Sequence, residues 1–113
     1  MTLHNEQNIE TSFPLVSVVM CTYNGESYLR QQIDSILAQS YPNFELVIAD
    51  DASADRTVSI LEEYRQKDSR VRYVVNEKNK GYNKNFEYAF SLARADYIAI
   101  SDQDDIWELH KIE

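Results

Sequence analysis

Residues 15–49, LVSVVMCTYNGESYLRQQIDSILAQSYPNFELVIA, decide the fold of this 113-residue chain. The stretch begins with a valine-rich apolar run, 15–20, and ends with a second short apolar run, 44–49. Continuous apolar runs of this length are typical of strands in a parallel sheet covered on both faces. Between the runs, four apolar residues recur at the spacing of one helix face: Leu29, Ile33, Ile36 and Leu37. The stretch therefore predicts a strand, a helix and a second strand.

The same alternation continues along the chain. A helix after residue 53, with Ser53 as its N-cap, is predicted from a second apolar face: Thr57, Ile60, Leu61 and Tyr64. A third helix is predicted from Phe86, Ala89, Phe90 and Ala93. Apolar runs at 71–75 and 97–100 predict two more strands. The order β-α-β-α-β-α-β predicts an α/β fold with a mainly parallel sheet and right-handed crossovers.

Composition excludes several classes of protein. The formal net charge of −8 disfavours nucleic acid as a partner, because no basic patch opposes it. The single cysteine, Cys21, cannot form an internal disulfide, which is consistent with a reducing cytosol. No stretch of the sequence approaches the length of a membrane span. Residues 1–12 are polar and aperiodic, and we expect them to be a flexible leader.

Polar residues follow three of the predicted strands. They are Thr22-Tyr23-Asn24 after the first strand, Asp50-Asp51 after the second, and Asp102-Gln103-Asp104-Asp105 after the fourth. Ligands of open parallel sheets bind beyond the carboxyl ends of the strands, so we expect the three clusters to meet at one edge.

Each cluster also has a purely structural interpretation. The first is compatible with a strand-to-helix turn, and Asp50-Asp51 with helix capping. The last is compatible with a solvated acidic turn, although Asp102 and Asp104 are spaced to reach one site. Carboxylate oxygens select Mg²⁺ or Mn²⁺ over softer metals, so the sequence favours a divalent cation there.

Three segments resemble one known family when taken together. They are residues 16–57 (VSVVMCTYNGESYLRQQIDSILAQSYPNFELVIADDASADRT), 79–89 (NKGYNKNFEYA) and 95–107 (ADYIAISDQDDIW). In this order they resemble the N-terminal half of a family 2 glycosyltransferase of the GT-A fold, similar to bacterial rhamnosyltransferase-like polysaccharide enzymes. The resemblance implies a Rossmann-like α/β/α fold, with residues 13–113 as the nucleotide-sugar-binding part. The acceptor half is then absent.

The resemblance also implies roles for single residues. The nucleoside of a UDP- or dTDP-sugar is expected against Tyr23 and Asp51, with Asp51 accepting the N3–H of uracil or thymine. Asp50 either does the same or supports the loop. Lys84 is expected to contact phosphate. The nucleotide-binding set implied by the resemblance is Thr22, Tyr23, Asn24, Glu26, Asp50, Asp51, Lys84 and Asp102.

The metal and the chemistry are implied in the same way. The DXD motif of the family falls on Asp102-Gln103-Asp104, with Asp104 and Asp102 as ligands of Mn²⁺ or Mg²⁺. The reaction is an inverting sugar transfer to a saccharide or lipid-linked saccharide acceptor in surface polysaccharide biosynthesis. The general base is expected beyond Glu113, so the fragment alone is expected to be inactive. The expected location is the cytoplasm, including the inner face of the membrane, and uncovered apolar surface predicts self-association.

Other functions remain to be compared with this one. A non-catalytic module that binds a nucleotide or nucleotide-sugar uses the same site. A phosphoacceptor receiver domain needs an acid pair after its first strand, where this chain has Thr22-Tyr23-Asn24. A dinucleotide-binding protein is disfavoured because the two glycines, Gly25 and Gly81, cannot form a G-x-G-x-x-G motif.

Overall fold

The computed structural model describes residues 13–102, 107 and 112. The predicted leader, residues 1–12, and the proposed metal ligand Asp104 lie outside the described residues. Within them, strands and helices alternate as β1 (Val16–Thr22), α2 (Leu29–Leu37), β2 (Phe44–Asp50), α3 (Thr57–Lys67), β3 (Val71–Val75), α4 (Tyr82–Ser91) and β4 (Tyr97–Ser101). This order is the predicted one.

The four strands form one parallel sheet in the order β3-β2-β1-β4. Thr22 at the end of β1 is opposite Asp50, and Asp50 is opposite Val75 at the end of β3. Met20 of β1 is opposite Ser101 at the end of β4. The carboxyl ends of all four strands therefore lie along one edge of the sheet, and the loops that follow them meet there.

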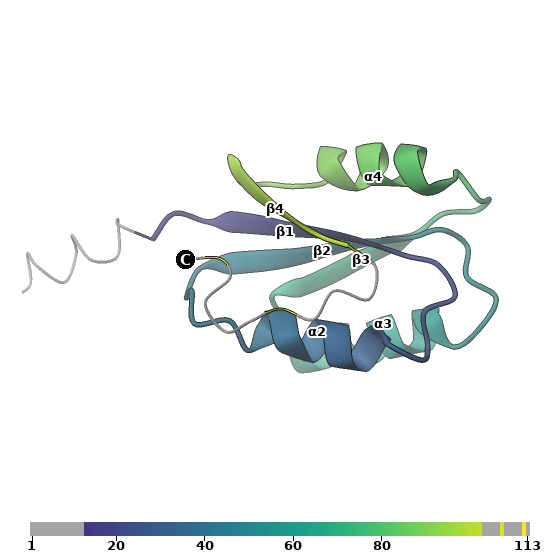
Figure 1. Cartoon of the computed structure of the whole chain (residues 1–113), viewed down its shortest axis with the longest axis horizontal. Helices are drawn as coiled ribbons and strands as arrows, with labels where there is room; N and C mark the ends of the chain where they lie inside the picture. Colours follow the sequence, from purple (N-terminus) through teal and green to yellow (C-terminus); the bar gives the residue numbers. More distant parts are fainter. Residues whose placement is uncertain (1–12, 103–106, 108–111, 113) are drawn as a thin grey trace, which may run out of the picture.

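Helices cover both faces of the sheet, which makes three layers. Figure 1 shows α2 and α3 together on one face and α4 alone on the other. The α/β class, the parallel sheet and the α/β/α layers predicted from the sequence are confirmed.

The two faces of the sheet are packed unequally. The side chains of β1 and β2 alternate between the faces, as strand geometry requires. Val18, Met20, Leu46 and Ile48 contribute to a large core beneath α2 and α3. The core beneath α4 is small: its buried members are Val19, Ala49 and Ala89. Apolar packing therefore holds α4 less firmly than α2 and α3.

Two helix details differ from the sequence prediction. Helix α3 begins at Thr57, and Ser53 is not its N-cap. Asp55 instead accepts hydrogen bonds from the backbone N–H and the hydroxyl of Thr57, at 2.9 and 2.5 Å. On α4 the buried residues are Asn85 and Ala89, whereas Phe90 is exposed. The helix is oriented this way because Asn85 donates to the carbonyl of Ala49 on β2, at 2.9 Å.

Candidate functional site

The side chains at the carboxyl ends of β1 and β2 are joined beneath the surface. Asp50 is fully buried, and its Oδ1 accepts hydrogen bonds from the hydroxyls of Thr22 (2.7 Å) and Ser53 (2.6 Å). The backbone N–H of Ser53 donates to Oδ2 at 2.9 Å. Of the two roles expected for Asp50, these contacts fit support of the loop. Because its carboxylate is enclosed, Asp50 is not accessible to a ligand in this structure.

Asn24 and Glu26 fasten the loop after β1 to the loop after β2. Asn24 adopts a left-handed backbone (φ 48°), its N–H donates to the Ser53 hydroxyl, and its Oδ1 accepts from the Ala54 N–H, both at 2.8 Å. Glu26 Oε1 accepts from the N–H of Arg56 at 3.3 Å. Both predicted residues therefore hold one loop to the other, and neither lines the cavity described next.

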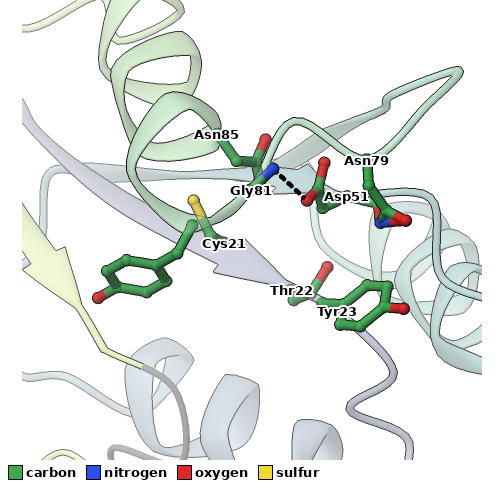
Figure 2. Close-up of a pocket in the computed structure, with 8 residues that line it drawn as sticks. Cys21, Thr22, Tyr23, Asp51, Asn79, Gly81 and Asn85 are labelled. Atoms are coloured by element: carbon green, nitrogen blue, oxygen red, sulfur yellow. Dashed lines mark hydrogen bonds between the residues drawn. The ribbon is translucent and has the colours of Figure 1, made fainter.

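A cavity of about 330 Å³ opens where these loops meet the start of α4. Figure 2 shows the residues around it, which come from the end of β1, the loop after β2, and the loop and first turns of α4. Its lining residues are Cys21, Thr22, Tyr23, Asp51, Asn79, Gly81, Tyr82 and Asn85. Three predicted residues, Thr22, Tyr23 and Asp51, are thus brought to one cavity.

Asp51 is the charged group that lines this cavity. Its Oδ1 accepts hydrogen bonds from the Lys80 N–H (2.7 Å) and from Asn76 Nδ2 (2.9 Å). Its Oδ2 accepts from the Gly81 N–H at 3.1 Å, the bond drawn in Figure 2. Because Gly81 is the N-cap position of α4, the carboxylate also lies at the positive end of that helix.

These contacts keep Asp51 ionised. Burial alone would raise its pKa, but the hydrogen bonds from Lys80, Asn76 and Gly81 outweigh burial and hold the pKa below its ordinary value. An ionised carboxylate offers about four acceptor positions, and donors from the described part of the chain fill three of them. Asp51 therefore retains one acceptor position, on Oδ2, for an N–H or O–H donor in the cavity.

The other cavity walls are aromatic and apolar. The Tyr23 side chain is 49% exposed and that of Tyr82 is 58% exposed, so each offers a ring to a ligand. Cys21 also lies on the wall of the cavity (Figure 2). Burial first, and then the charge of Asp51, raise the pKa of the Cys21 thiol to about 12, so the thiol is neutral at pH 7. It acts as a small apolar surface rather than as a nucleophile.

Lys84 and Asp102 lie outside this cavity. Lys84 is exposed on α4 and is not among the lining residues. Asp102 is exposed directly after β4, and the Tyr82 hydroxyl donates to its Oδ1 at 3.4 Å, a long hydrogen bond. Tyr82 and Asp102 also line a neighbouring groove with Phe86, Phe90 and Ile100. Tyr82 therefore separates the cavity from the groove and belongs to both.

The predicted metal site falls largely outside the described residues. Asp104 is not described, and among residues 13–102, 107 and 112 no three His, Cys, Asp or Glu side chains are grouped to hold a metal ion. Asp102, the other predicted ligand, has an exposed carboxylate that is only weakly engaged by Tyr82, and oxygen donors of this kind suit Mg²⁺ or Mn²⁺.

The predicted set omits several residues of this site, among them Asn76, Asn79 and Tyr82. Asn76 donates to the Asp51 carboxylate, and Asn79 Nδ2 donates to the Asp51 carbonyl at 2.5 Å. A signal exists in the sequence, because four asparagines occur between residues 76 and 85. Amide groups at that density in a short loop are donors available to a nearby carboxylate.

Comparison with known proteins gives a consistent family. Residues 17–113 match the Glycosyl transferase family 2 profile. Bacillus subtilis TuaG, a putative teichuronic acid biosynthesis glycosyltransferase, is 39% identical over 100 residues, which is 88% of this chain and 40% of TuaG. Escherichia coli WfgD, a UDP-Glc:alpha-D-GlcNAc-diphosphoundecaprenol beta-1,3-glucosyltransferase, is 39% identical over 88% of this chain and 38% of its own. The chain thus spans well under half the length of these relatives.

Solved structures agree with the fold. S. aureus TarS in complex with UDP superposes with a TM-score of 0.79 at 32% identity, covering 86% of this chain and 29% of that one. The mannosyltransferase PcManGT from Pyrobaculum calidifontis, in complex with GDP-Man and Mn²⁺, gives a TM-score of 0.77 at 28% identity, covering 83% of this chain and 28% of its own. Within the described residues of this chain, no helix has both the length and the apolar character needed to cross a bilayer.

Proposed function

Because the chain belongs to glycosyl transferase family 2, we propose that it carries the donor-binding half of an enzyme that transfers a sugar from a UDP- or dTDP-sugar. The single observation that supports this most is the cavity at the carboxyl edge of the sheet, where Asp51 keeps one unused acceptor position. The N3–H of uracil or thymine fits that position. A charge-assisted hydrogen bond of this kind contributes about 1.5–3 kcal/mol.

The remaining predicted residues take supporting roles in this proposal. The ring of Tyr23 flanks the pyrimidine, and Thr22 and Asp50 hold the wall beneath it. Asn24 and Glu26 fix the two loops that shape the entrance. Lys84, exposed on α4, contacts the diphosphate. Glu26 and Asn24 thus act on the nucleotide through the loops rather than by touching it.

The cation is assigned to the residues that follow β4. Asp102 and Asp104 are the proposed ligands, and Mn²⁺ is supported over a metal-free site by the complex of PcManGT with GDP-Man and Mn²⁺. A divalent cation there joins the carboxylates to the diphosphate and stabilises the charge of the departing nucleoside diphosphate. Mg²⁺ has the same oxygen preference and remains the alternative.

The acceptor and the general base are proposed to lie in the part of the enzyme that this chain does not span. WfgD is named for a diphosphoundecaprenol acceptor, and TuaG for teichuronic acid biosynthesis. A saccharide or lipid-linked saccharide acceptor, in surface polysaccharide synthesis at the cytoplasmic face of the membrane, is therefore the proposed setting. Inversion at the anomeric carbon needs a general base to deprotonate the acceptor, and we propose that this base lies beyond Glu113 and that the fragment alone is inactive.

The second candidate is a binding module that holds a nucleotide-sugar without transferring the sugar. It is favoured by the same cavity, since none of the residues that line it is a free general base. Glycosyl transfer, or slow hydrolysis of the sugar-nucleotide, by a longer form of the protein separates the two. Transfer supports the enzyme, whereas tight binding with neither reaction supports the module.

The test of the proposed function is a thermal-shift panel of nucleotide-sugars with and without Mn²⁺. We expect UDP- and dTDP-sugars to raise the melting temperature and Mn²⁺ to increase the shift, because a ligand at 100 times its Kd adds about 2.7 kcal/mol of stability. Asp104→Ala should remove the effect of the metal and leave the smaller metal-free shift. Equal shifts for adenosine and uridine nucleotides would count against the proposal, as would no shift at all.

A further inference from the structure

Two asparagine side chains lie buried next to Asp51. Asn76, directly after β3, is 7% exposed, and Asn85, on the second turn of α4, is 1% exposed. Burying an amide costs free energy unless its polar atoms find partners, and a small apolar residue would suit the thin core beneath α4 better. Their positions therefore call for a reason other than packing.

The two amides form a chain of hydrogen bonds from the sheet to the carboxylate. Asn85 Nδ2 donates to the Ala49 carbonyl (2.9 Å), and Asn85 Oδ1 accepts from Asn76 Nδ2 (2.8 Å). Asn76 Nδ2 also donates to Asp51 Oδ1 (2.9 Å). The backbone carbonyl accepts only, so it fixes the orientation of the Asn85 amide, which in turn fixes that of Asn76.

This arrangement leaves a polar atom without compensation. Asn76 Oδ1 is buried, and no described residue donates to it. An unsatisfied buried oxygen lowers stability. The unsatisfied oxygen of Asn76 therefore lowers stability, while both N–H groups of the same amide donate hydrogen bonds, one to Asn85 and one to Asp51.

We propose that Asn76 and Asn85 are positioning residues that orient the Asp51 carboxylate so that its free acceptor position faces the cavity and selects a base with an imide N–H. The proposal rests on the proposed donor site. Asn76 and Lys80 occupy Oδ1, so the carboxylate is held with Oδ2 available beside Gly81. Without Asn76, only the N–H groups of Lys80 and Gly81 hold the carboxylate, and Oδ1 gains a second free acceptor position that competes with the one on Oδ2.

The experiment compares two probes, UDP and its N3-methyl analogue, which lacks the donor that Asp51 reads. Calorimetry gives the affinity ratio for the full chain and for Asn76→Ala, Asn85→Ala and Asn43→Ala. Asn43→Ala is the matched control, since it is the same substitution at an asparagine that precedes β2, where its amide donates to the Phe13 carbonyl. We expect the full chain and the control to prefer UDP by 10-fold or more, and both asparagine variants to prefer it by less than 3-fold.

The outcomes separate the two proposals. A 10-fold preference that survives in both asparagine variants overturns the positioning role and leaves the donor site intact. Failure of the full chain to bind UDP overturns the donor site and the positioning role together. Should Asn76→Ala fail to fold, Asn76→Ser and a carbon-13 NMR titration of Asp51 decide instead. A higher Asp51 pKa in Asn76→Ser, with no change in Asn43→Ala, supports the proposal, and an unchanged pKa overturns it.

Discussion

Two adjacent aspartates at the end of β2 have opposite surroundings. Asp50 is the last residue of the strand, and its carboxylate is closed by Thr22 and Ser53. Asp51 is the next residue, faces the α4 side and keeps an acceptor position in the cavity. Successive side chains along an extended backbone point to opposite sides, so a difference of one position changes a supporting residue into one that can meet a ligand.

Replacing Asp51 tests this difference. Asp51→Ala should weaken UDP binding by about 10- to 100-fold even when EDTA removes all metal, because a charge-assisted hydrogen bond is lost. Calorimetry measures the change. The same variant should melt at a lower temperature, since α4 loses its N-terminal acceptor. Asp68→Ala is the control for stability, because it breaks an ion pair with Arg70 just before β3, at the amino ends of the strands. Equal UDP affinity in Asp51→Ala and Asp68→Ala would contradict the assignment.

Prediction from the sequence places Asp51 at the carboxyl edge of the sheet, where it lies, but does not foresee Asn76, and the reason is physical. Asp51 directly follows an apolar strand, and a parallel sheet brings such positions to one edge whatever the loops do. Asn76 and Asn79 reach Asp51 across 25 and 28 residues, through the particular path of the loop before α4. The sequence shows that amide groups are present in this loop, but it does not predict the path that brings them to Asp51.

Helix α4 is attached mainly by carboxylates. Asp51 accepts from the N–H groups of Lys80 and Gly81 at its start. At its other end, Glu45 accepts from the Arg94 N–H (2.9 Å) and from Arg72, which also donates to the Leu92 carbonyl. Both carboxylates belong to or directly follow β2, and the apolar core between them is small. α4 therefore depends on charge more than α2 and α3 do.

Acid should loosen α4 before the other helices. Burial alone would raise the pKa of Glu45 and of Asp51, but hydrogen bonds outweigh it and both pKa values lie below their ordinary values. Because the pKa of each carboxyl group is lower in the folded state, the ionised group stabilises the fold fully at any pH above its ordinary pKa of about 4. This stabilisation is lost as the pH falls through the lowered pKa. NMR spectra recorded from pH 6 to pH 2 should show the α4 amides changing first.

A variant isolates one of the two attachments. Glu45→Gln should weaken the end of α4 at pH 6 and make its response to acid shallower, because the titrating group is gone. Glu63→Gln is the control, since Glu63 of α3 forms an exposed ion pair with Arg30 of α2, and its loss should leave α4 unchanged. Simultaneous loss of all helices in one transition would show that α4 is held as firmly as the rest.

At this scale the sequence predicts element order better than element ends. Apolar runs place all four strands within two residues of where they lie. The N-terminus of α3 is predicted wrongly because Ser53, a good capping residue, is already engaged by Asp50 and Asn24. The burial of Asn85 is also unexpected, because a periodicity rule counts apolar residues and cannot foresee a buried amide.

Within the described residues, the side of the molecule formed by β4 carries uncovered apolar groups. β4 is an edge strand, and its Tyr97, Ile98 and Ile100 are exposed. Ile100 lines a groove together with the exposed residues Tyr82 and Phe90 of α4, and this groove extends to Asp102. Exposed edge strands with apolar side chains are templates for pairing with another chain. We propose that a second copy of this chain covers that side.

Analytical ultracentrifugation tests this proposal. The chain should form a dimer at high concentration, and Ile98→Lys together with Ile100→Lys should weaken it by at least 10-fold, since charge on an edge strand opposes pairing. Val75→Lys is the matched control, because Val75 is an exposed β-branched residue on β3, the opposite edge. A strict monomer at high concentration, or equal weakening by Val75→Lys, would argue against a β4 interface.

Five hydrogen bonds join the loop after β1 to the loop after β2 and to Thr57, the first residue of α3. The conformation of each loop therefore depends on that of the other. The N–H groups of Asn24, Gly25 and Glu26 donate to Ser53, Thr57 and Asp55, and those of Ala54 and Arg56 donate back. Inserting or deleting a single residue in either loop would move the donors of these hydrogen bonds away from their acceptors. A chimaera that borrows residues 23–28 from a relative must therefore borrow residues 51–57 from the same relative.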